Sequence, residues 1–273
     1  MSHPLDDVRL ERVLDALRRA GAVIQEVRAR GFSVADKGGA GPVTEADHAA
    51  DALLREVLPA ILPAAWLSEE TKDDPARLAA DRLWVVDPLD GTKEFVEGVP
   101  QYSVAVGLVE GGVPIFGAVH QPVTGDTWWA RRGGGCFRNG VPVRVAGGNA
   151  LGASRSEMKR GEFEPFVEGW DLRPIGSIAF KLALVASGEL AATVSRGPKH
   201  EWDVCAGAML VLEAGGVAVD CFGEALAFNR PFPKSRGILA GAPDAAARVL
   251  AVVERVGVSD RMDEFPPRAA TGT

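Results

Sequence analysis

The sequence predicts a mixed α/β protein of the α+β kind, built from two lobes. Three observations carry this prediction: helical patterns open the chain, strand-like segments fill its middle, and strands alternate with helices in its second half. Its 273 residues suit one large domain or two closely packed lobes. We assign the lobes to residues 1–149 and 150–273, with the seam near 147–152.

The first part of the chain is predicted to be helical. Apolar residues recur at helical spacing from Leu5 to Ala29. A glycine-rich loop follows at 38–42. Thr44 and Asp47 then form a Thr-x-x-Asp pair, typical of a capping box, which predicts a second helix from Thr44. We expect Pro59 and Pro63 to end that helix.

The middle of the chain is predicted to form a meander of strands. These strands are expected at residues 83–86, 103–109, 113–119, 126–130 and 141–145. Glu110-Gly111-Gly112 joins the second and third as a hairpin turn. The segment 131–140 is expected to be a glycine-rich turn, because it lacks the strand and helix that flank a dinucleotide-binding loop.

The second half is predicted to alternate between helix and strand. The expected segments are a helix at 177–187, a strand at 189–194, a helix at 202–214, strands at 217–221 and 238–241, and a helix at 243–256. Gly215 and Gly216 are expected to terminate the helix before them. The polar tail beyond Asp260 is expected to be loosely held.

Composition narrows the class of partner. The formal net charge of −7 argues against nucleic acid, whose phosphates need a basic surface. No stretch has the roughly 18 apolar residues of a membrane span, and the N-terminus lacks a signal core. Three cysteines without CxxC spacing indicate reduced, buried thiols. We therefore predict a cytoplasmic protein that acts on a small molecule.

Acidic residues gather at four boundaries between predicted elements, where functional residues concentrate. The four clusters are residues 43–47, 68–71, 87–92 and 202–203. Most have a structural alternative: a capping box for Asp47, a solvated turn for Glu69 and an N-cap for Asp203.

The cluster at 87–92, Asp-Pro-Leu-Asp-Gly-Thr, is the hardest to explain structurally, because a turn does not need two carboxylates after a buried strand. Its spacing lets Asp87, Asp90 and the Leu89 carbonyl converge on one point. Oxygen ligands of this kind suit Mg²⁺, and four histidines in the chain are too few for a typical zinc or iron site.

These motifs together resemble the inositol monophosphatase superfamily. The resemblance rests on Asp87-Pro88-Leu89-Asp90-Gly91-Thr92, with Glu69-Glu70 upstream and Trp202-Asp203-Val204-Cys205-Ala206-Gly207 downstream, and it spans nearly the whole chain. It implies a layered α/β/α/β sandwich. It also implies a Mg²⁺-dependent phosphatase in which water attacks phosphorus directly. Members of the family often form homodimers, so the resemblance makes a homodimer possible for this chain.

The resemblance also implies a role for each site residue. The ligands of two or three Mg²⁺ ions are Glu69, Asp87, the Leu89 carbonyl, Asp90 and Asp203. Thr92 and Glu69 orient the attacking water, and Asp47 supports the threonine and a further metal. Gly91 and Thr92 offer backbone donors to the phosphate.

The substrate prediction depends on finer features. Lys93-Glu94-Phe95 and Gly-Pro-x-x-Glu-Trp-Asp at 197–203 resemble the bacterial 3'(2'),5'-bisphosphate nucleotidase branch. Arg196 stands seven residues before Asp203, where inositol monophosphatases carry an acid, and a guanidinium favours a second phosphate. Lys199 adds to this patch unless both side chains lie on a solvated loop. The favoured substrate is 3'-phosphoadenosine 5'-phosphate, and inositol 1-phosphate is the alternative.

Two further residues are weaker substrate candidates. Ser177 starts a predicted helix, where it is either an anion contact or an N-cap, with Lys181 facing solvent in the second case. His200 is a lone loop histidine. Two other functions stay open: a sugar-bisphosphate phosphatase, and a phosphate sensor without turnover. A sensor predicts the loss of a metal carboxylate, and none is missing.

Overall fold

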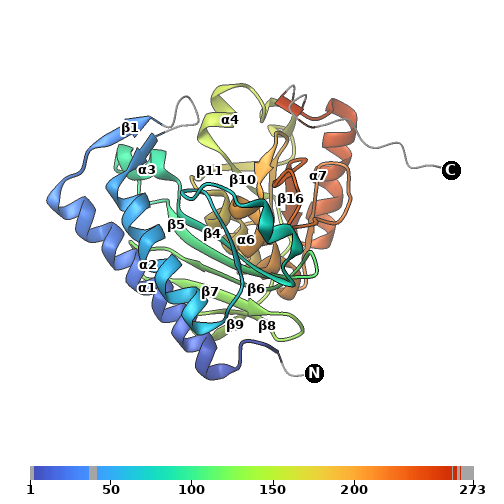
Figure 1. The fold of residues 1–273 in the computed structure, drawn as a ribbon. Helices are drawn as coiled ribbons and strands as arrows, with labels where there is room; N and C mark the ends of the chain where they lie inside the picture. Colours follow the sequence, from blue (N-terminus) through green and yellow to red (C-terminus); the bar gives the residue numbers. More distant parts are fainter. Residues whose placement is uncertain (1–2, 37–41, 260, 263–264, 266–273) are drawn as a thin grey trace.

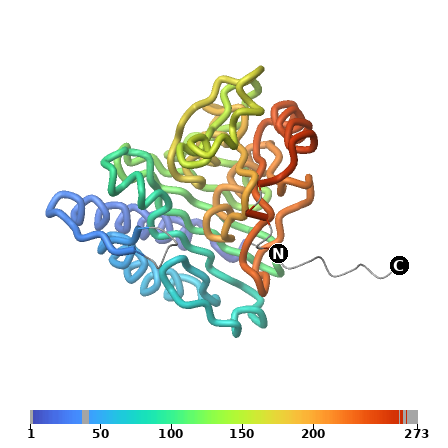
Figure 2. Tube along the Cα trace, turned by 90° about the horizontal axis from the view of Figure 1, so that it is seen from above, coloured from blue at the N-terminus to red at the C-terminus, as the bar shows by residue number. Residues whose placement is uncertain are grey.

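The computed structural model describes residues 3–36, 42–259, 261–262 and 265. Helices and sheets alternate in layers across the molecule (Figure 1). The perpendicular view in Figure 2 separates the N-terminal helices, in blue, from the last helix, in red, at the opposite side. This layering brings acidic residues from distant parts of the sequence near one another.

The outer N-terminal layer consists of two helices, α1 (Asp7–Arg30) and α2 (Glu45–Ile61). Asp6 caps α1 by accepting a hydrogen bond from the Arg9 N–H at 2.9 Å. The apolar faces of both helices pack against strands of the larger sheet in one core cluster, in which Leu17 and Leu54 are completely buried. A short two-stranded ribbon, β1 (Val34–Asp36) with β2 (Pro42–Thr44), lies between the helices in the sequence.

The larger sheet has seven strands in sequence order. They are β3 (Ala65–Ser68), β4 (Arg82–Asp90), β5 (Ser103–Glu110), β6 (Val113–His120), β7 (Thr127–Arg131), β8 (Gly135–Arg138) and β9 (Val141–Val143). β3 pairs parallel to β4, and every later pair is antiparallel. The 3₁₀ helix η1 (Pro75–Ala79) connects β3 to β4, and α3 (Thr92–Glu97) follows β4.

The middle layer consists of α5 (Ile178–Ala186) and α6 (Glu201–Glu213), whose buried residues share one core with strands of both sheets. Two glycines of the larger sheet let α6 lie close to it. A Cβ on Gly107 would stand 2.6 Å from Cys205 Sγ, and one on Gly117 would collide with the Ala206 carbonyl. This contact fixes the start of α6 near the ends of the sheet strands.

The smaller sheet has five strands in the order β11-β10-β12-β16-β14, with both parallel and antiparallel pairs. Their bounds are β10 (Ala150–Ala153), β11 (Asp171–Pro174), β12 (Ala192–Ser195), β14 (Val217–Val219) and β16 (Ile238–Gly241). α7 (Pro243–Val256) packs on this sheet in a core of its own. Smaller elements are α4 (Arg155–Lys159), η2 (Glu164–Phe166) and the ribbon of β13 (Lys199–His200) with β15 (Lys234–Ser235).

The layered α/β architecture predicted from the sequence is confirmed, with α7 adding an outer layer to the expected four. The last predicted strand and helix, at 238–241 and 243–256, have the expected bounds. The boundary between residues 149 and 150 lies between the two sheets, but the division into lobes stays a prediction.

Several predicted details were wrong. Pro59 lies inside α2 rather than ending it, since the helix continues to Ile61, before Pro63. The expected turn at 131–140 contains β8, and the expected seam contains the start of β10. α3, β11 and the β13–β15 ribbon were not predicted, because each depends on pairing or packing with distant segments. Most of the loop at 38–42 and most of the tail lie outside the described residues.

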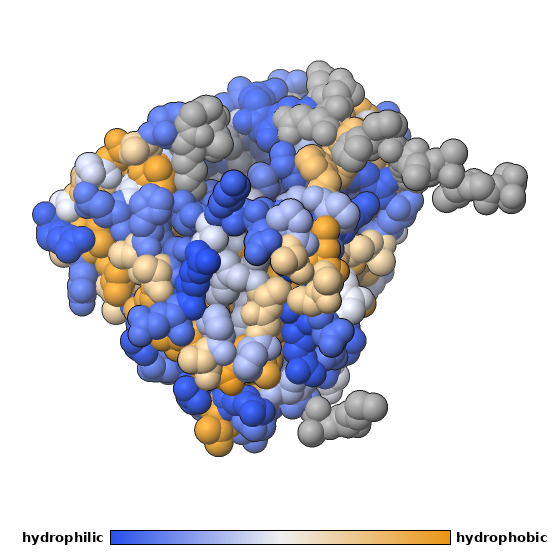
Figure 3. Space-filling model, in the orientation of Figure 1, coloured by the Kyte–Doolittle hydropathy of each residue, from blue (hydrophilic) through white to orange (hydrophobic). Residues whose placement is uncertain are grey.

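Among the described residues on the face shown in Figure 3, no single broad apolar patch is visible. Hydrophilic and hydrophobic residues are interspersed on the side shown in Figure 3. Exposed large apolar side chains come from separate elements, such as Val8 of α1 and Val141 of β9. No helix within the described ranges is long and apolar enough to cross a membrane.

Candidate active site

The end of β4 carries the first pair of carboxylates. Asp87 and Asp90 belong to the strand itself, which runs four residues beyond the predicted end at Val86. Pairing with β5 shifts register between the two aspartates, so the strand is irregular where both side chains leave it. Asp87 is buried, and its Oδ1 accepts the Leu89 N–H at 3.1 Å.

The start of α2 reaches the same region through its capping box. Asp47 Oδ2 accepts both the backbone N–H and the hydroxyl of Thr44, each at 2.7 Å. The other oxygen of Asp47 accepts the Thr92 hydroxyl at 2.7 Å, from the first residue of α3. Asp47 is fully buried. The predicted cap and the predicted support of Thr92 are therefore the same side chain.

The loop after β3 carries Glu69 and is held by an aspartate that sequence reasoning missed. Asp51 of α2 accepts the Ser68 hydroxyl at 2.5 Å and the Thr71 hydroxyl at 3.1 Å, on either side of Glu69. The Glu69 N–H donates to the Val86 carbonyl of β4 at 3.3 Å. Asp51 lies four residues after Asp47, on the same helix face, and that spacing was the available signal.

Asp90 is held from the middle layer. Its Oδ2 accepts the Ser177 hydroxyl and the Ala179 N–H, each at 2.6 Å. Ser177 is also the N-cap of α5, accepting the Phe180 N–H at 3.0 Å. The capping role considered for Ser177 is thus present together with a direct link to Asp90.

Asp203 comes from the first turn of α6. The structural alternative for Asp203 was an N-cap, but the N-cap position of α6 is His200 and Asp203 is the third residue of the helix. Its Oδ2 accepts the His200 N–H at 3.0 Å. The backbone contact therefore leaves its other oxygen, Oδ1, available for a different partner.

Electrostatics show that these carboxylates share one space. Burial raises the pKa of Asp87 well above its usual range, and the negative charges of four other carboxylates raise it further. Those carboxylates belong to Glu69, Asp90, Asp203 and Asp47. The pKa of Asp203 rises to about 8, first through burial and then through the charges of Asp90 and Glu69. All five predicted acidic residues therefore converge.

This donor set fits a hard divalent cation. It offers oxygen ligands only, and a cation between the carboxylates would offset the repulsion that raises their pKa values. Within the described part of the chain, however, no group of three or more His, Cys, Asp or Glu side chains already has the arrangement of a metal site. The individual ligands therefore stay a proposal.

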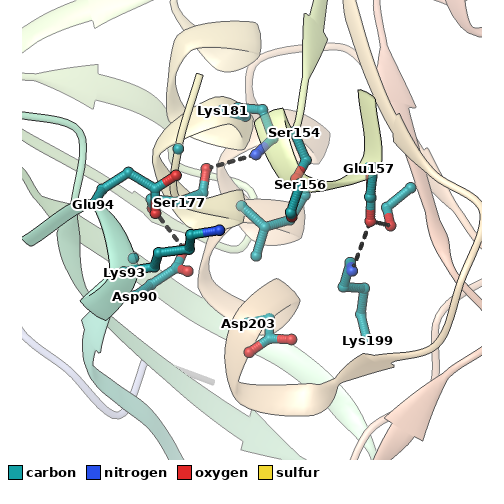
Figure 4. A pocket seen from close by; sticks show the side chains of 14 residues that line it. Asp90, Lys93, Glu94, Ser154, Ser156, Glu157, Ser177, Lys181, Lys199 and Asp203 are labelled. Carbon is teal, nitrogen blue, oxygen red and sulfur yellow. Dashed lines mark hydrogen bonds and ion pairs between the residues drawn. The ribbon is translucent and has the colours of Figure 1, made fainter. Parts of the chain in front are cut away.

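A pocket of about 220 Å³ opens beside Asp90 and Asp203. Its lining residues are Asp90, Gly91, Lys93, Glu94, Ser154, Ser156, Glu157, Gly176, Ser177, Ile178, Lys181, Ser195, Lys199 and Asp203. Lys93 and Lys199 approach from opposite sides, with Asp203 below and the serines above (Figure 4). The lining contains no aromatic side chain and a single large apolar one, Ile178.

The predicted substrate contacts divide into two groups. Gly91 and Ser177 line the pocket, whereas Thr92, Arg196 and His200 do not. Arg196 donates instead to the carbonyls of Gly257 and Glu162, both at 3.0 Å. The His200 ring stacks on Trp202 with centroids 4.2 Å apart.

Lys181 was expected to face solvent if Ser177 served only as a cap, and that expectation was wrong. The side chain is buried, and its Nζ donates to the carbonyls of Ile175 and Ser177. It lines the pocket from the middle layer.

Comparison with known proteins agrees with this geometry. A fructose-1,6-bisphosphatase/inositol-1-monophosphatase of Thermotoga maritima is 37% identical over 186 residues, covering 65% of this chain and 71% of the relative. The 3'(2'),5'-bisphosphate nucleotidase CysQ of Aggregatibacter actinomycetemcomitans is 31% identical, covering 81% and 87%. Among solved structures, the extragenic suppressor protein suhB of Bartonella henselae superposes with a TM-score of 0.80 at 25% identity, covering 92% of this chain and 100% of its own. The model of the inositol monophosphatase family matches residues 7–257, and the chain belongs to that family.

Proposed function

We propose that this protein is a Mg²⁺-dependent phosphomonoesterase acting on a small phosphorylated metabolite with a hydroxyl-rich leaving group. The family is one of phosphatases, typically dependent on Mg²⁺. One observation carries the proposal: five acidic side chains from four separate segments act electrostatically on one another around Asp87. An excess of buried negative charge of this kind is costly without a cation.

The residues proposed to hold the ions are Glu69, Asp87, Asp90, Asp203 and the Leu89 carbonyl. Bound Mg²⁺ would supply positive charge to the phosphoryl oxygens and lower the pKa of water. Ser177 and the Ala179 N–H occupy one oxygen of Asp90 and thereby orient the other. The backbone of Gly91 and Thr92, at the start of α3, would donate to the phosphate.

Thr92 and Glu69 are proposed to orient the attacking water. The Thr92 hydroxyl gives its hydrogen to Asp47 at 2.7 Å, its shortest contact. Its oxygen can therefore accept a hydrogen bond from the water, and the water keeps a lone pair directed at phosphorus. Asp47 is a positioning residue in this scheme.

The pocket supports a small polyol or sugar monophosphate, such as inositol 1-phosphate, as the substrate. Its volume of about 220 Å³ is below the roughly 300–1,000 Å³ of pockets for drug-sized ligands. Four serines line it, and no aromatic ring is present for a base to stack on. Of the features that favour a bisphosphorylated nucleoside in the sequence, Arg196 is the one expected to meet the second phosphate, and its guanidinium is bonded to backbone carbonyls elsewhere.

3'-Phosphoadenosine 5'-phosphate is the second candidate. Lys93 and Lys199 face each other across the pocket and could meet a second phosphate there. A relative named as a bisphosphate nucleotidase is 31% identical to this chain.

Phosphate release tests both levels of the proposal. We would measure kcat/KM with Mg²⁺ and with EDTA for inositol 1-phosphate, fructose 1,6-bisphosphate and 3'-phosphoadenosine 5'-phosphate. We expect Mg²⁺-dependent release, highest for the inositol ester, and a loss of at least about 10³-fold in Asp87→Asn. Asp126→Asn, which removes a carboxylate paired with Arg138 outside the pocket, is the matched control.

The outcomes separate the alternatives. A preference for the adenosine bisphosphate would replace the polyol assignment. Binding of an ester without phosphate release would favour a sensor instead of an enzyme.

A further inference from the structure

An ion pair forms the pocket wall opposite Asp90 and Lys93. Lys199 Nζ lies 3.0 Å from Glu157 Oε1, and the side chains of these residues are 17% and 4% exposed. The hydroxyl of Ser195 donates to the same carboxylate oxygen. The three residues come from β13, α4 and β12, so the fold brings the pair together from separate segments.

This pair is poorly explained as a device for stability. The second carboxylate oxygen of Glu157, Oε2, is buried, and no described residue donates a hydrogen bond to it. A buried carboxylate with one oxygen unsatisfied costs free energy that an apolar residue would not. Two other cations are near, but Lys181 and Arg196 donate to backbone carbonyls instead. A buried carboxylate oxygen without a donor, inside a pocket, therefore points to a functional role for Glu157.

The pair borders the space that the leaving group must occupy. Glu157 and Lys199 line the same pocket as Asp90 and Asp203, and the charge of Lys199 acts on the Asp203 carboxylate. In Figure 4 Lys199 rises on the right-hand side toward Glu157, and Asp203 lies to its left. A phosphate held near Asp90 and Asp203 would therefore leave the rest of its ester in the pocket that Lys199 lines.

We propose that the Glu157–Lys199 pair determines specificity, with Lys199 contacting the leaving group and Glu157 offsetting its charge. A lysine already paired with a carboxylate can donate to a hydroxyl oxygen. It attracts a second phosphate much less strongly than an unpaired lysine does. The pair thus favours hydroxylated monophosphates over bisphosphates. This inference rests on the proposed phosphatase function and extends it to leaving-group selection.

Opposite shifts in two variants test the proposal. We would measure kcat/KM for inositol 1-phosphate and for fructose 1,6-bisphosphate, and take their ratio. Glu157→Gln keeps the shape and removes the offsetting charge, so we expect the ratio to shift about tenfold toward the bisphosphate. Lys199→Met leaves an uncompensated carboxylate beside the leaving group, so we expect a shift of similar size away from it.

The control and the contrary results are defined by the same ratio. Ser235→Ala removes a hydroxyl that donates to the backbone carbonyl of Lys199 and changes no charge, so it should leave the ratio within about twofold, whatever it does to the melting temperature. Equal ratios in all four proteins, with an active wild type, would overturn the proposed specificity role of the Glu157–Lys199 pair but not the proposed phosphatase function. A wild type that hydrolyses neither ester would refute the proposed function itself. If Glu157→Gln fails to fold, the shift in Lys199→Met alone decides the question.

Discussion

At the scale of single residues, the two carboxylate oxygens of Asp90 have different roles. Oδ2 is bonded to Ser177 and to the Ala179 N–H, which leaves Oδ1 for an ion. Ser177 adopts φ +57°, an uncommon conformation for a residue other than glycine. Because its hydroxyl donates to Asp90, it must accept from Ser103, 3.0 Å away. The strain at Ser177 is thus offset by a chain of buried hydrogen bonds.

Ser103→Ala should weaken Mg²⁺ binding as well as folding. Losing this buried donor costs about 0.5–1.5 kcal/mol and loosens Ser177, and with it the orientation of Asp90. We expect the Mg²⁺ concentration for half-maximal activity to rise several-fold. This is less than the roughly 10–100-fold effect of removing a residue bonded directly to a metal ligand, because Ser103 acts on Asp90 through Ser177. Ser187→Ala removes a comparable hydroxyl from the end of α5 and is the control. An unchanged Mg²⁺ requirement in Ser103→Ala would show that Ser103 is purely structural.

The same scale shows what the sequence can and cannot predict. The acidic residues were identifiable because two carboxylates after one buried strand have few structural uses, and because the acidic motifs taken together resemble a known family. Arg196 was not, because its distance of seven residues from Asp203 says nothing about direction, and tertiary structure turns it toward Gly257. Lys181 was misplaced because helical spacing cannot reveal that both sides of α5 face other layers. Glu157 carried no sequence signal at all.

At the scale of elements, helix starts place the acidic groups. Asp47 lies in the first turn of α2, Asp203 in that of α6, and Ser177 caps α5. Negative charge is favourable at these ends, which lowers the cost of gathering carboxylates there. Capping and the proposed catalysis therefore use the same residues, and this is why the two interpretations could not be separated from the sequence.

Thr44→Ala separates the two roles of the α2 cap. Removing the threonine hydroxyl should cost about 1 kcal/mol of stability, as for other N-caps, and should leave Asp47 Oδ2 with the Thr44 backbone N–H as its remaining donor from that residue. We expect phosphate release to fall by about tenfold, because Asp47 then holds the Thr92 hydroxyl less firmly. Asp6→Ala removes the cap of α1, away from the pocket, and should cost similar stability with normal activity. Equal activity in both variants would count against a positioning role for Asp47.

The contact between α6 and the larger sheet predicts a second effect of this kind. In Gly117→Ala the new methyl group meets the Ala206 carbonyl, which is backbone and cannot turn aside. We expect about 1–3 kcal/mol of destabilisation, together with weaker Mg²⁺ binding because α6 carries Asp203. Gly147→Ala is the matched control, since a Cβ there has open space. Urea unfolding measures the stability and Mg²⁺ titration measures the affinity for the ion. A loss of stability with normal Mg²⁺ binding would show that the position of Asp203 does not depend on this contact.

At the scale of the whole molecule, the carboxylate cluster should make stability depend on metal. Chelation leaves the five acidic side chains to repel one another, so Mg²⁺ should raise the melting temperature of the wild type by several degrees. Asp87→Asn removes the carboxylate at the centre of this repulsion. In EDTA it should therefore be at least as stable as the wild type, and Mg²⁺ should stabilise it much less. A melting temperature indifferent to Mg²⁺ in the wild type would contradict the shared ion site.

The packing of α1 on the larger sheet gives the protein a separate dependence on pH. His120, at the end of β6, is buried beneath Gly21 of α1, and its Nδ1 lies 2.8 Å from Thr127 Oγ1. Burial, followed by the charge of Arg18, lowers the pKa of His120 from 6.5 to about 4. The folded state thus keeps a neutral imidazole under conditions in which the unfolded chain takes up a proton.

The sign of the effect follows from that difference. The stability contributed by neutral His120 is complete above pH 6.5 and is lost as the pH falls toward 4. The loss is about 1.4 kcal/mol per pH unit within this window. His120→Gln has no such group, so its free energy of unfolding should fall less between pH 7 and pH 5, measured by urea unfolding in EDTA. The carboxylate cluster is present in both proteins, so its own pH dependence cancels in the difference. Parallel pH profiles for the two proteins would mean that His120 does not resist protonation in the folded state.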